Sequence, residues 1–439
     1  MERKFGMKRK NIVILTAVHP YLDSGIIAFD LMQILKQAKY KVIIITNATL
    51  EKNYKNTISL NPSITIDFTN RVLNRLKITL NRILKKDSAN LDPNYYMFGL
   101  NQDSNNSLAE KVLQMLPFKV DSFIYLFPQN FLNTEDLNYL NKKSGAPIFW
   151  SMADMAAITG GCHYAWNCLG YTNKCGSCPG VYSDDKNDLT HQLWKEKKKY
   201  IESSNIIPVA GSEWQFNQLK NSSLFINKNK YKILLPIDDE LFKPNSKTEA
   251  RKKLGLPKDK KIIFFGAALL NQKRKGLKEL IESLVILKSE IQKEDTDDIF
   301  LAIAGRSNQH LDNEIPFAYK TLGYLNYNQL ATAYQAADVF VCPSIEDSGP
   351  MMINQSIMCG TPVVSFEMGV ALDLVINNET GFKVENKNTL KFAKAINNIL
   401  SLPAKEMEKM SSNCRALGIE KTSMHSIKKQ WINILENEL

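Results

Sequence analysis

The sequence predicts an α/β protein built from two doubly wound, Rossmann-like domains in series. Short apolar runs alternate with helical stretches along most of the chain, which is the pattern of parallel sheets covered on both faces. The chain has 439 residues, 44% hydrophobic and 23% charged, which is too long for one compact core and sufficient for two. A stretch rich in Pro, Asp and Lys at residues 235–257 separates the two alternating regions.

The first half opens with a βαβ unit. Strands are expected at residues 11–17, 41–46, 122–126, 147–151 and 205–210, and helices at 27–37 and 184–203. The small residues Ser24 and Gly25 lie in the loop after the first strand. Open α/β sheets bind their ligands at such loops.

The alternation of apolar runs and helical stretches restarts after residues 235–257. Strands are expected at residues 261–266, 299–305, 339–343 and 362–366, and helices at 276–289, 329–337, 350–358 and 423–435. The predicted domains are residues 1–235 and 236–422, with the C-terminal helix 423–439 packing back onto the first.

The segment EDSGPMMINQSIMCGTPVV, residues 346–364, combines acids with a helix start. Pro350 suits the first helical turn, and the N–H groups near Met351 and Met352 lack partners within the helix and favour an anion such as a diphosphate. Gln355 lies about one turn further on. The alternative interpretation is a buried helix, because most of these side chains are apolar.

This segment resembles the signature of retaining glycosyltransferases of family 4, in which two acids eight positions apart precede C-G-T-P-V-V. Aligning residues 359–364 with that signature places the first acid at Asp347 and the second at Gln355. Gly266 with residues 273–276, the pair Gly323 and Tyr324, and Gly25 match other family segments in order. The resemblance implies a GT-B fold, whose two domains face each other across a cleft.

By this resemblance the C-terminal half binds a UDP- or GDP-sugar. Asp347 would bind hydroxyls of the donor sugar, and Gln355 those of the ribose, without the charge of a carboxylate. The loop at Gly323 and Tyr324 would meet the base. Arg274, Lys275 and the helix N-terminus would stabilise the leaving diphosphate without a metal, and catalysis would require no cofactor.

The implied activity is transfer of a hexose-type sugar, with retention, to a saccharide acceptor bound by the N-terminal half. A lipid-linked acceptor in bacterial surface polysaccharide synthesis is expected. The competing interpretations are a weakened nucleotide-sugar-binding or scaffold protein, favoured by the loss of Glu at position 355, and a sugar-nucleotide epimerase of the same fold.

Four cysteines, Cys162, Cys168, Cys175 and Cys178, stand in a C-x5-C-x6-C-x2-C array. Such an array suits a structural zinc ion, two labile disulfides or buried thiols. The segment T-G-G-C-H-Y resembles one found in a polysaccharide-assembling branch of family 4, which usually has a His-Asp pair before it. Here Ala153 replaces that histidine, so Asp154 is the preferred acceptor-side candidate, with His163 as the alternative.

The net charge is +11, and residues 1–100 hold 16 Lys+Arg against 7 Asp+Glu. Residues 71–86 form a basic amphipathic pattern that suits either an anionic membrane surface or a helix packed on the core. No nucleic-acid-binding motif accompanies this charge. No apolar run reaches the length of about 18 residues that spans a bilayer. A cytoplasmic protein, peripheral at the inner face of the plasma membrane, is therefore expected.

Overall fold

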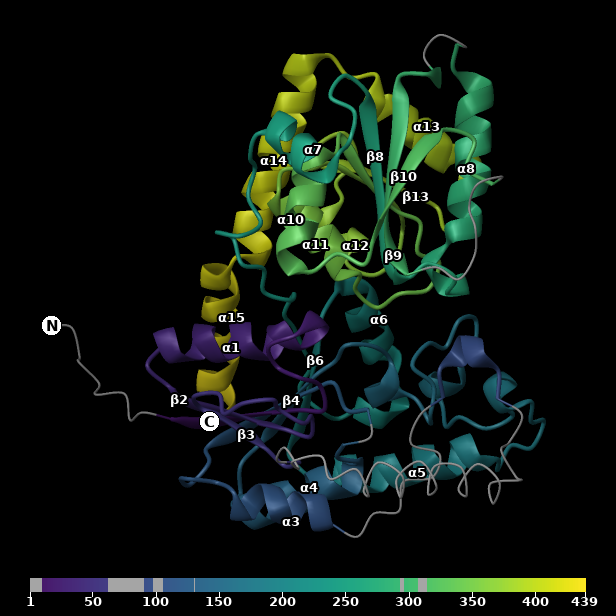
Figure 1. Ribbon diagram of the computed structural model, residues 1–439. Helices are drawn as coiled ribbons and strands as arrows, with labels where there is room; N and C mark the ends of the chain where they lie inside the picture. Colours follow the sequence, from purple (N-terminus) through teal and green to yellow (C-terminus); the bar gives the residue numbers. More distant parts are fainter. Residues whose placement is uncertain (1–9, 62–90, 98–105, 130, 293–295, 307–313) are drawn as a thin grey trace, which may run out of the picture. The chain divides into compact units, whose positions relative to one another are not determined.

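The computed structural model describes residues 10–61, 91–97, 106–129, 131–292, 296–306 and 314–439 (Figure 1). The chain divides into two compact units. Unit 1 comprises Met1–Val209, Gln218–Tyr231 and Ile432–Leu439, and unit 2 comprises Ala210–Asn217 and Lys232–Trp431. Each unit contains its own sheet with strands paired in parallel, which confirms the α/β fold class with two Rossmann-like domains.

The sheet of unit 1 has the order β3-β2-β1-β4-β5-β6-β7 among the described residues. Its strands are β1 (Asn11–Thr16), β2 (Lys41–Thr46), β3 (Thr57–Ser59), β4 (Ser122–Leu126), β5 (Ile148–Ser151), β6 (Ile206–Ala210) and β7 (Tyr231–Lys232). The central strands β1, β2 and β4 are almost wholly buried, which explains why their sequences are continuous apolar runs.

The helices described in this part of the chain are α1 (Ile26–Gln37), α3 (Ser107–Gln114), α4 (Thr134–Ser144), α5 (Leu189–Glu202) and α6 (Glu213–Asn221). The first residues of α6, up to Asn217, are assigned to unit 2. The expected start of α5 at residue 184 is wrong. Asp188 is the N-cap, because its side chain accepts hydrogen bonds from the N–H groups of Thr190 and His191. The residues before it form a loop instead.

The sheet of unit 2 has the order β10-β9-β8-β11-β12-β13. Its strands are β8 (Lys261–Leu269), β9 (Ile299–Arg306), β10 (Ala318–Gly323), β11 (Val339–Cys342), β12 (Val363–Phe366) and β13 (Gly381–Val384). All neighbouring pairs are parallel. The strand order reverses between β8 and β11, because β9 and β10 continue on one side of β8 and β11 to β13 lie on the other.

Helices cover both faces of this sheet. The helices described after β7 are α7 (Lys247–Leu254), α8 (Leu277–Glu290), α10 (Tyr327–Ala336), α11 (Met351–Met358), α12 (Ala371–Leu374), α13 (Thr389–Leu400), α14 (Ala404–Thr422) and, at the end of the chain and away from this sheet, α15 (Met424–Glu438). Figure 1 shows α8 and α13 on one side of the sheet and α7, α10 and α14 on the other. The last turns of α15 belong to unit 1.

Candidate functional site

The reversal of strand order in unit 2 brings two loops together. The 3-10 helix Lys273–Lys275 follows β8, and the loop that leads to α11 follows β11. In a parallel sheet, loops that leave neighbouring strands in opposite directions open a crevice at the carboxyl edge, and ligands bind there. The expected donor loops therefore lie at the topological switch point of unit 2.

Three of the predicted catalytic side chains meet at this point. Asp347 Oδ2 accepts from Arg274 Nη1 at 3.0 Å and from Lys275 Nζ at 2.5 Å, while Oδ1 accepts from the Gly349 N–H at 3.3 Å. All three charged side chains are at least four-fifths buried. We call Arg274, Lys275 and Asp347 the ion cluster.

The backbone fixes the two loops against each other. The N–H of Ile345 donates to the carbonyl of Arg274 at 2.9 Å. Gly276 has φ +71°, and a Cβ at this position would stand 1.7 Å from the carbonyl oxygen of Pro343. Only glycine allows this approach, so the position of the two cations depends on the glycine that follows them.

Electrostatics favour the ionised form of Asp347. Burial alone would raise the pKa of this carboxyl, but the ammonium of Lys275 and then the guanidinium of Arg274 outweigh burial and lower the pKa below its ordinary value of 3.8. Asp347 is therefore a carboxylate at neutral pH, and the cluster carries a net charge of about +1 beside α11.

The N-terminus of α11 adjoins this cluster. Pro350 is its N-cap, and Met351 and Met352 form the first turn. Their N–H groups precede the first possible intrahelical acceptors, so this helix end attracts anions. Gly266 lies near the end of β8, where a Cβ would stand 2.5 Å from Met352 Cε. The structure thus brings together four predicted donor-binding residues, Gly266, Pro350, Met351 and Met352, around the ion cluster.

Gln355 lies one turn deeper in α11 and is fully buried. Its Oε1 accepts from the hydroxyl of Tyr334 on α10 at 3.0 Å, whereas Nε2 is buried without a hydrogen-bond partner among the described residues. An unpaired buried donor is uncommon and costs free energy unless a water or ligand oxygen satisfies it. The role of Gln355 in holding ribose hydroxyls stays a prediction.

The predicted base-binding pair lies at the end of the edge strand β10. Gly323 has φ +68°, and the ring of Tyr324 lies 4.4 Å from the guanidinium of Arg306. Tyr324 is 41% exposed. The pair follows the second strand from β8, on the β9 side of the switch point, and its contact with a base stays a prediction.

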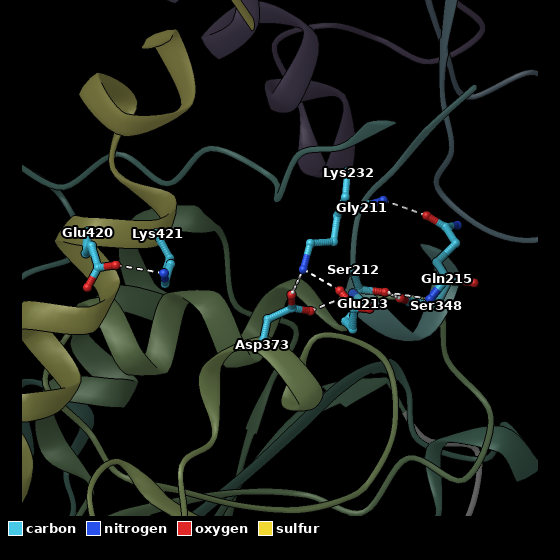
Figure 2. Close-up of polar contacts among 9 residues, drawn as sticks. All are labelled: Gly211, Ser212, Glu213, Gln215, Lys232, Ser348, Asp373, Glu420 and Lys421. Carbon is cyan, nitrogen blue, oxygen red and sulfur yellow. Dashed lines mark hydrogen bonds and ion pairs between the residues drawn. The ribbon is translucent and has the colours of Figure 1, made fainter. Parts of the chain in front are cut away.

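A second set of contacts involves Ser348, in the loop after Asp347, and Asp373 of α12 (Figure 2). Ser212 Oγ donates to the carbonyl of Ser348. The N–H of Glu213 donates to Asp373 Oδ2 at 2.7 Å, and Lys232 Nζ binds Asp373 Oδ1 at 2.8 Å. All five residues belong to unit 2. Sequence reasoning missed them because partners separated by 136, 160 and 141 positions leave no local pattern.

The predicted residues Gly25 and Asp154 belong to unit 1. Gly25 precedes α1, and a Cβ there would stand 2.1 Å from the carbonyl oxygen of His19, so the loop after β1 requires glycine. Asp154 follows β5; its Oδ2 lies 2.6 Å from His163 Nδ1, and its Oδ1 accepts from the Ala156 N–H at 2.7 Å. The two acceptor-side candidates are therefore one buried pair, in which the carboxylate orients the imidazole.

The four cysteines between β5 and α5 are free thiols that line one pocket. Burial raises the pKa of Cys162 and Cys178, and that of Cys175 to about 11. In the described part of the chain, no three or more His, Cys, Asp or Glu side chains are grouped so that they could hold a metal ion as they stand. The zinc assignment therefore stays a prediction.

The structure bears on the membrane prediction at one point. None of the helices among the described residues combines the length and apolarity needed to cross a bilayer. The basic segment 71–86 lies outside the described residues.

Comparison with solved structures establishes the class of fold. Sucrose-phosphate synthase of Thermosynechococcus elongatus is similar with a TM-score of 0.64 at 17% identity, covering 98% of this chain and 99% of that chain. HepE of Anabaena, solved with UDP and glucose, is similar with a TM-score of 0.60 at 13% identity, covering 98% and 100%. The protein has the GT-B fold, as the sequence predicts.

Comparison of sequences gives matches that lie mainly in unit 2. Residues 246–417 match the family model described as glycosyl transferases group 1. An uncharacterized glycosyltransferase of Methanocaldococcus jannaschii is 25% identical over 271 residues, 60% of this chain and 67% of that protein. A D-inositol 3-phosphate glycosyltransferase of Arthrobacter is 24% identical over 177 residues, 38% and 41%.

Proposed function

We propose that the protein is a retaining glycosyltransferase that moves a sugar from a UDP- or GDP-sugar to a saccharide acceptor. The observation that carries this proposal is the ion cluster at the switch point of unit 2, beside the N-terminus of α11. The cluster lies within residues 246–417, which match the family model of glycosyl transferases group 1. The similarity in fold to HepE, solved with UDP and glucose, supports a nucleotide-sugar donor.

The cluster suits cleavage of a bond between sugar and diphosphate. This cleavage places negative charge on the leaving phosphate oxygen. Arg274, Lys275 and the N–H groups of Met351 and Met352 form a positive site that is fixed before reaction, and such preorganised charge is a large source of rate acceleration. Because two side-chain cations are present, we propose that no metal is required.

Asp347 has two functions in this proposal. Its carboxylate holds Arg274 and Lys275 in place, and an approaching donor hydroxyl could hydrogen-bond to Oδ1, since each carboxylate oxygen accepts more than one bond. We propose that Asp154 acts on the acceptor side as a positioning residue through His163.

The broader role proposed is assembly of a bacterial surface polysaccharide on a lipid-linked acceptor, at the inner face of the plasma membrane. The T-G-G-C-H-Y segment and the basic residues 71–86 motivate it. The similarity to D-inositol 3-phosphate glycosyltransferases makes a phosphorylated polyol a second acceptor to test. The rival function, nucleotide-sugar binding without turnover, is favoured by Gln355, whose buried amide replaces an expected carboxylate.

Nucleotide release from a panel of UDP- and GDP-sugars, with acceptor and with water alone, tests the proposal. We expect Lys275→Ala to lower kcat by about 100-fold, because loss of one preorganised donor to a developing anion typically has that effect. Lys278→Ala is the matched control, since Lys278 is highly exposed in the first turn of α8. Equal turnover by wild type and Lys275→Ala would refute the donor-site assignment.

Retention of the anomeric configuration is tested by a separate measurement. We expect NMR of the product to show the anomeric configuration of the donor sugar. Inversion would leave the donor site in place and overturn retention. Tight binding of a nucleotide sugar without any release would instead support the rival binding function.

A further inference from the structure

The connection from β5 to α5 is unusually long for a compact α/β unit. Between Ser151 and Leu189 it contains only the 3-10 helices Ala156–Ile158, Gly170–Thr172 and Pro179–Val181. Long connections without regular elements are uncommon in compact domains and are usually functional or held by other means. All four cysteines of the array lie in this connection.

The four cysteines lie around one small space. Cys162, Cys168, Cys175 and Cys178 line a pocket of about 20 Å³, which has room for about one water-sized sphere. The remaining cysteines, Cys342, Cys359 and Cys414, belong to unit 2. The segment therefore gathers every cysteine of unit 1 around a volume suited to a single atom.

Backbone N–H groups point at the sulfur atoms. Gly160 N–H donates to Cys175 Sγ at 3.3 Å, and Gly170 N–H donates to Cys168 Sγ at 3.4 Å. Gly160 lies where a side chain would clash, because a Cβ there would stand 2.2 Å from the carbonyl oxygen of Thr190. Hydrogen bonds from N–H groups stabilise negative charge on an acceptor, and such outer contacts orient metal ligands.

The pair Cys175 and Cys178 forms a tight turn held by α5. Cys175, Gly176 and Ser177 have φ values of +41°, +103° and +46°. Gly176 N–H donates to Thr190 Oγ1 at 3.2 Å, and Cys178 N–H donates to Asp188 Oδ2 at 2.9 Å. The first turn of α5 thus holds the backbone of a C-x2-C turn, the spacing found in structural zinc sites.

We propose that Cys162, Cys168, Cys175 and Cys178 bind one structural zinc ion. Four thiolates favour a soft, tetrahedral cation, and occupation of all four positions by protein leaves none for catalysis. The sulfur atoms are not grouped as a metal site as they stand. All four cysteines line the same pocket, and rotation about its one side-chain torsion moves each sulfur between staggered positions, so zinc binding would select the rotamers that point into the pocket.

Binding changes the protonation of the site in a defined way. Each thiol transfers its proton to solvent as its sulfur bonds to the cation, so four protons leave for one Zn²⁺ bound. The resulting centre carries a charge of about −2. The ammonium of Lys197 lies near enough to interact with Cys175 and Cys162, and it offsets part of this charge. The site would cross-link the segment that contains His163, next to Cys162.

Metal analysis of the purified full-length protein, without a histidine tag, tests this proposal. We expect about one zinc per chain after exhaustive dialysis, and less than a tenth of that in Cys175→Ser and Cys178→Ser. Cys414→Ala is the matched control, because Cys414 is buried in α14 of unit 2, and it should retain the metal. Zinc-free wild-type protein from zinc-supplemented cells would overturn the proposal.

A second measurement on wild-type protein covers the case in which the variants fail to fold. Replacement of zinc by Co²⁺ should give the charge-transfer and d–d absorption of a tetrahedral cobalt thiolate centre. Absence of these bands, or recovery of the four cysteines as two disulfides, would refute the zinc site. Lys275→Ala should keep its zinc, so this inference and the proposed transferase activity fail or succeed separately.

Discussion

Asp347 is the side chain on which the candidate donor site depends most. It is nearly buried, and it is the shared partner of Arg274 and Lys275. Breaking a buried ion pair by removing one partner leaves charge without compensation and typically costs about 3 kcal/mol or more. A change at this position should therefore affect both turnover and folding.

The pH dependence of the stability of Asp347→Asn tests whether the ionised carboxylate stabilises the fold. The folded-state pKa of Asp347 lies below its ordinary value of 3.8, so its ionisation stabilises the fold above about pH 4 and this contribution disappears as the pH falls further. We expect the variant to be less stable than wild type in urea unfolding at pH 7, by about 3 kcal/mol. The difference should shrink as the pH falls below 4.

The control for this prediction is Asp259→Asn, because Asp259 is exposed in the same unit. It should follow the wild-type curve at every pH. A difference between Asp347→Asn and wild type that stays constant down to pH 3 would contradict the ionic explanation.

The sequence identifies some of these side chains but not their partners. Arg274, Lys275 and Asp347 were predicted from ordered motifs, and the structure brings them within hydrogen-bonding distance. Asp154 and His163 were alternatives for one role, and the structure pairs them. The contact between Gln355 and Tyr334 was not predicted, because which neighbour a buried amide meets depends on the packing of α10 against α11.

At the level of helices and strands, buried elements were predicted more accurately than exposed ones. Strands β2 and β11 are buried apolar runs and were predicted to within one residue. The edge strand β10 was missed because its residues are mostly exposed and form no apolar run. The start of α5 was placed at residue 184 instead of 189, because the sequence does not show which of the polar residues before the helix acts as its N-cap. In the structure this residue is Asp188.

The N-terminus of helix α6 allows a prediction about stability, because its first N–H group donates to a residue of another helix. Asp373 of α12 accepts from the Glu213 N–H at 2.7 Å and also binds Lys232 (Figure 2). Asp373→Ala should lower the free energy of unfolding by about 1 to 2 kcal/mol, the usual effect of losing a helix cap. Urea unfolding measures this change.

Asp373→Asn separates the hydrogen bond from the charge. The amide oxygen still accepts from Glu213, whereas the ion pair with the partly exposed Lys232 is lost. Because such pairs contribute less than about 1 kcal/mol, Asn should retain most of the stability. Equal losses in the Ala and Asn variants would show that the charge, and not the cap, carries the effect.

The chain as a whole contains two sheets of the same construction, each with a reversal of strand order beside its first strand, β1 or β8. Alternating apolar runs made this plan predictable. The assignment of Ala210–Asn217 to unit 2 was not foreseen. This segment precedes the predicted linker at 235–257, and its assignment rests on contacts such as Ser212 with Ser348, which only the folded chain creates.

Because each unit has its own core, a ligand of the donor site should be visible in the unfolding of unit 2. At 100 times its Kd, a nucleoside diphosphate that binds only the folded state adds about 2.7 kcal/mol. We expect UDP or GDP to raise the calorimetric melting temperature of one transition by roughly 5 to 10 °C. Lys275→Ala should abolish the shift, because the diphosphate loses a cation of the ion cluster, and Lys278→Ala should keep it. If neither nucleotide moves any transition of the wild-type protein, the switch point of unit 2 does not bind a diphosphate.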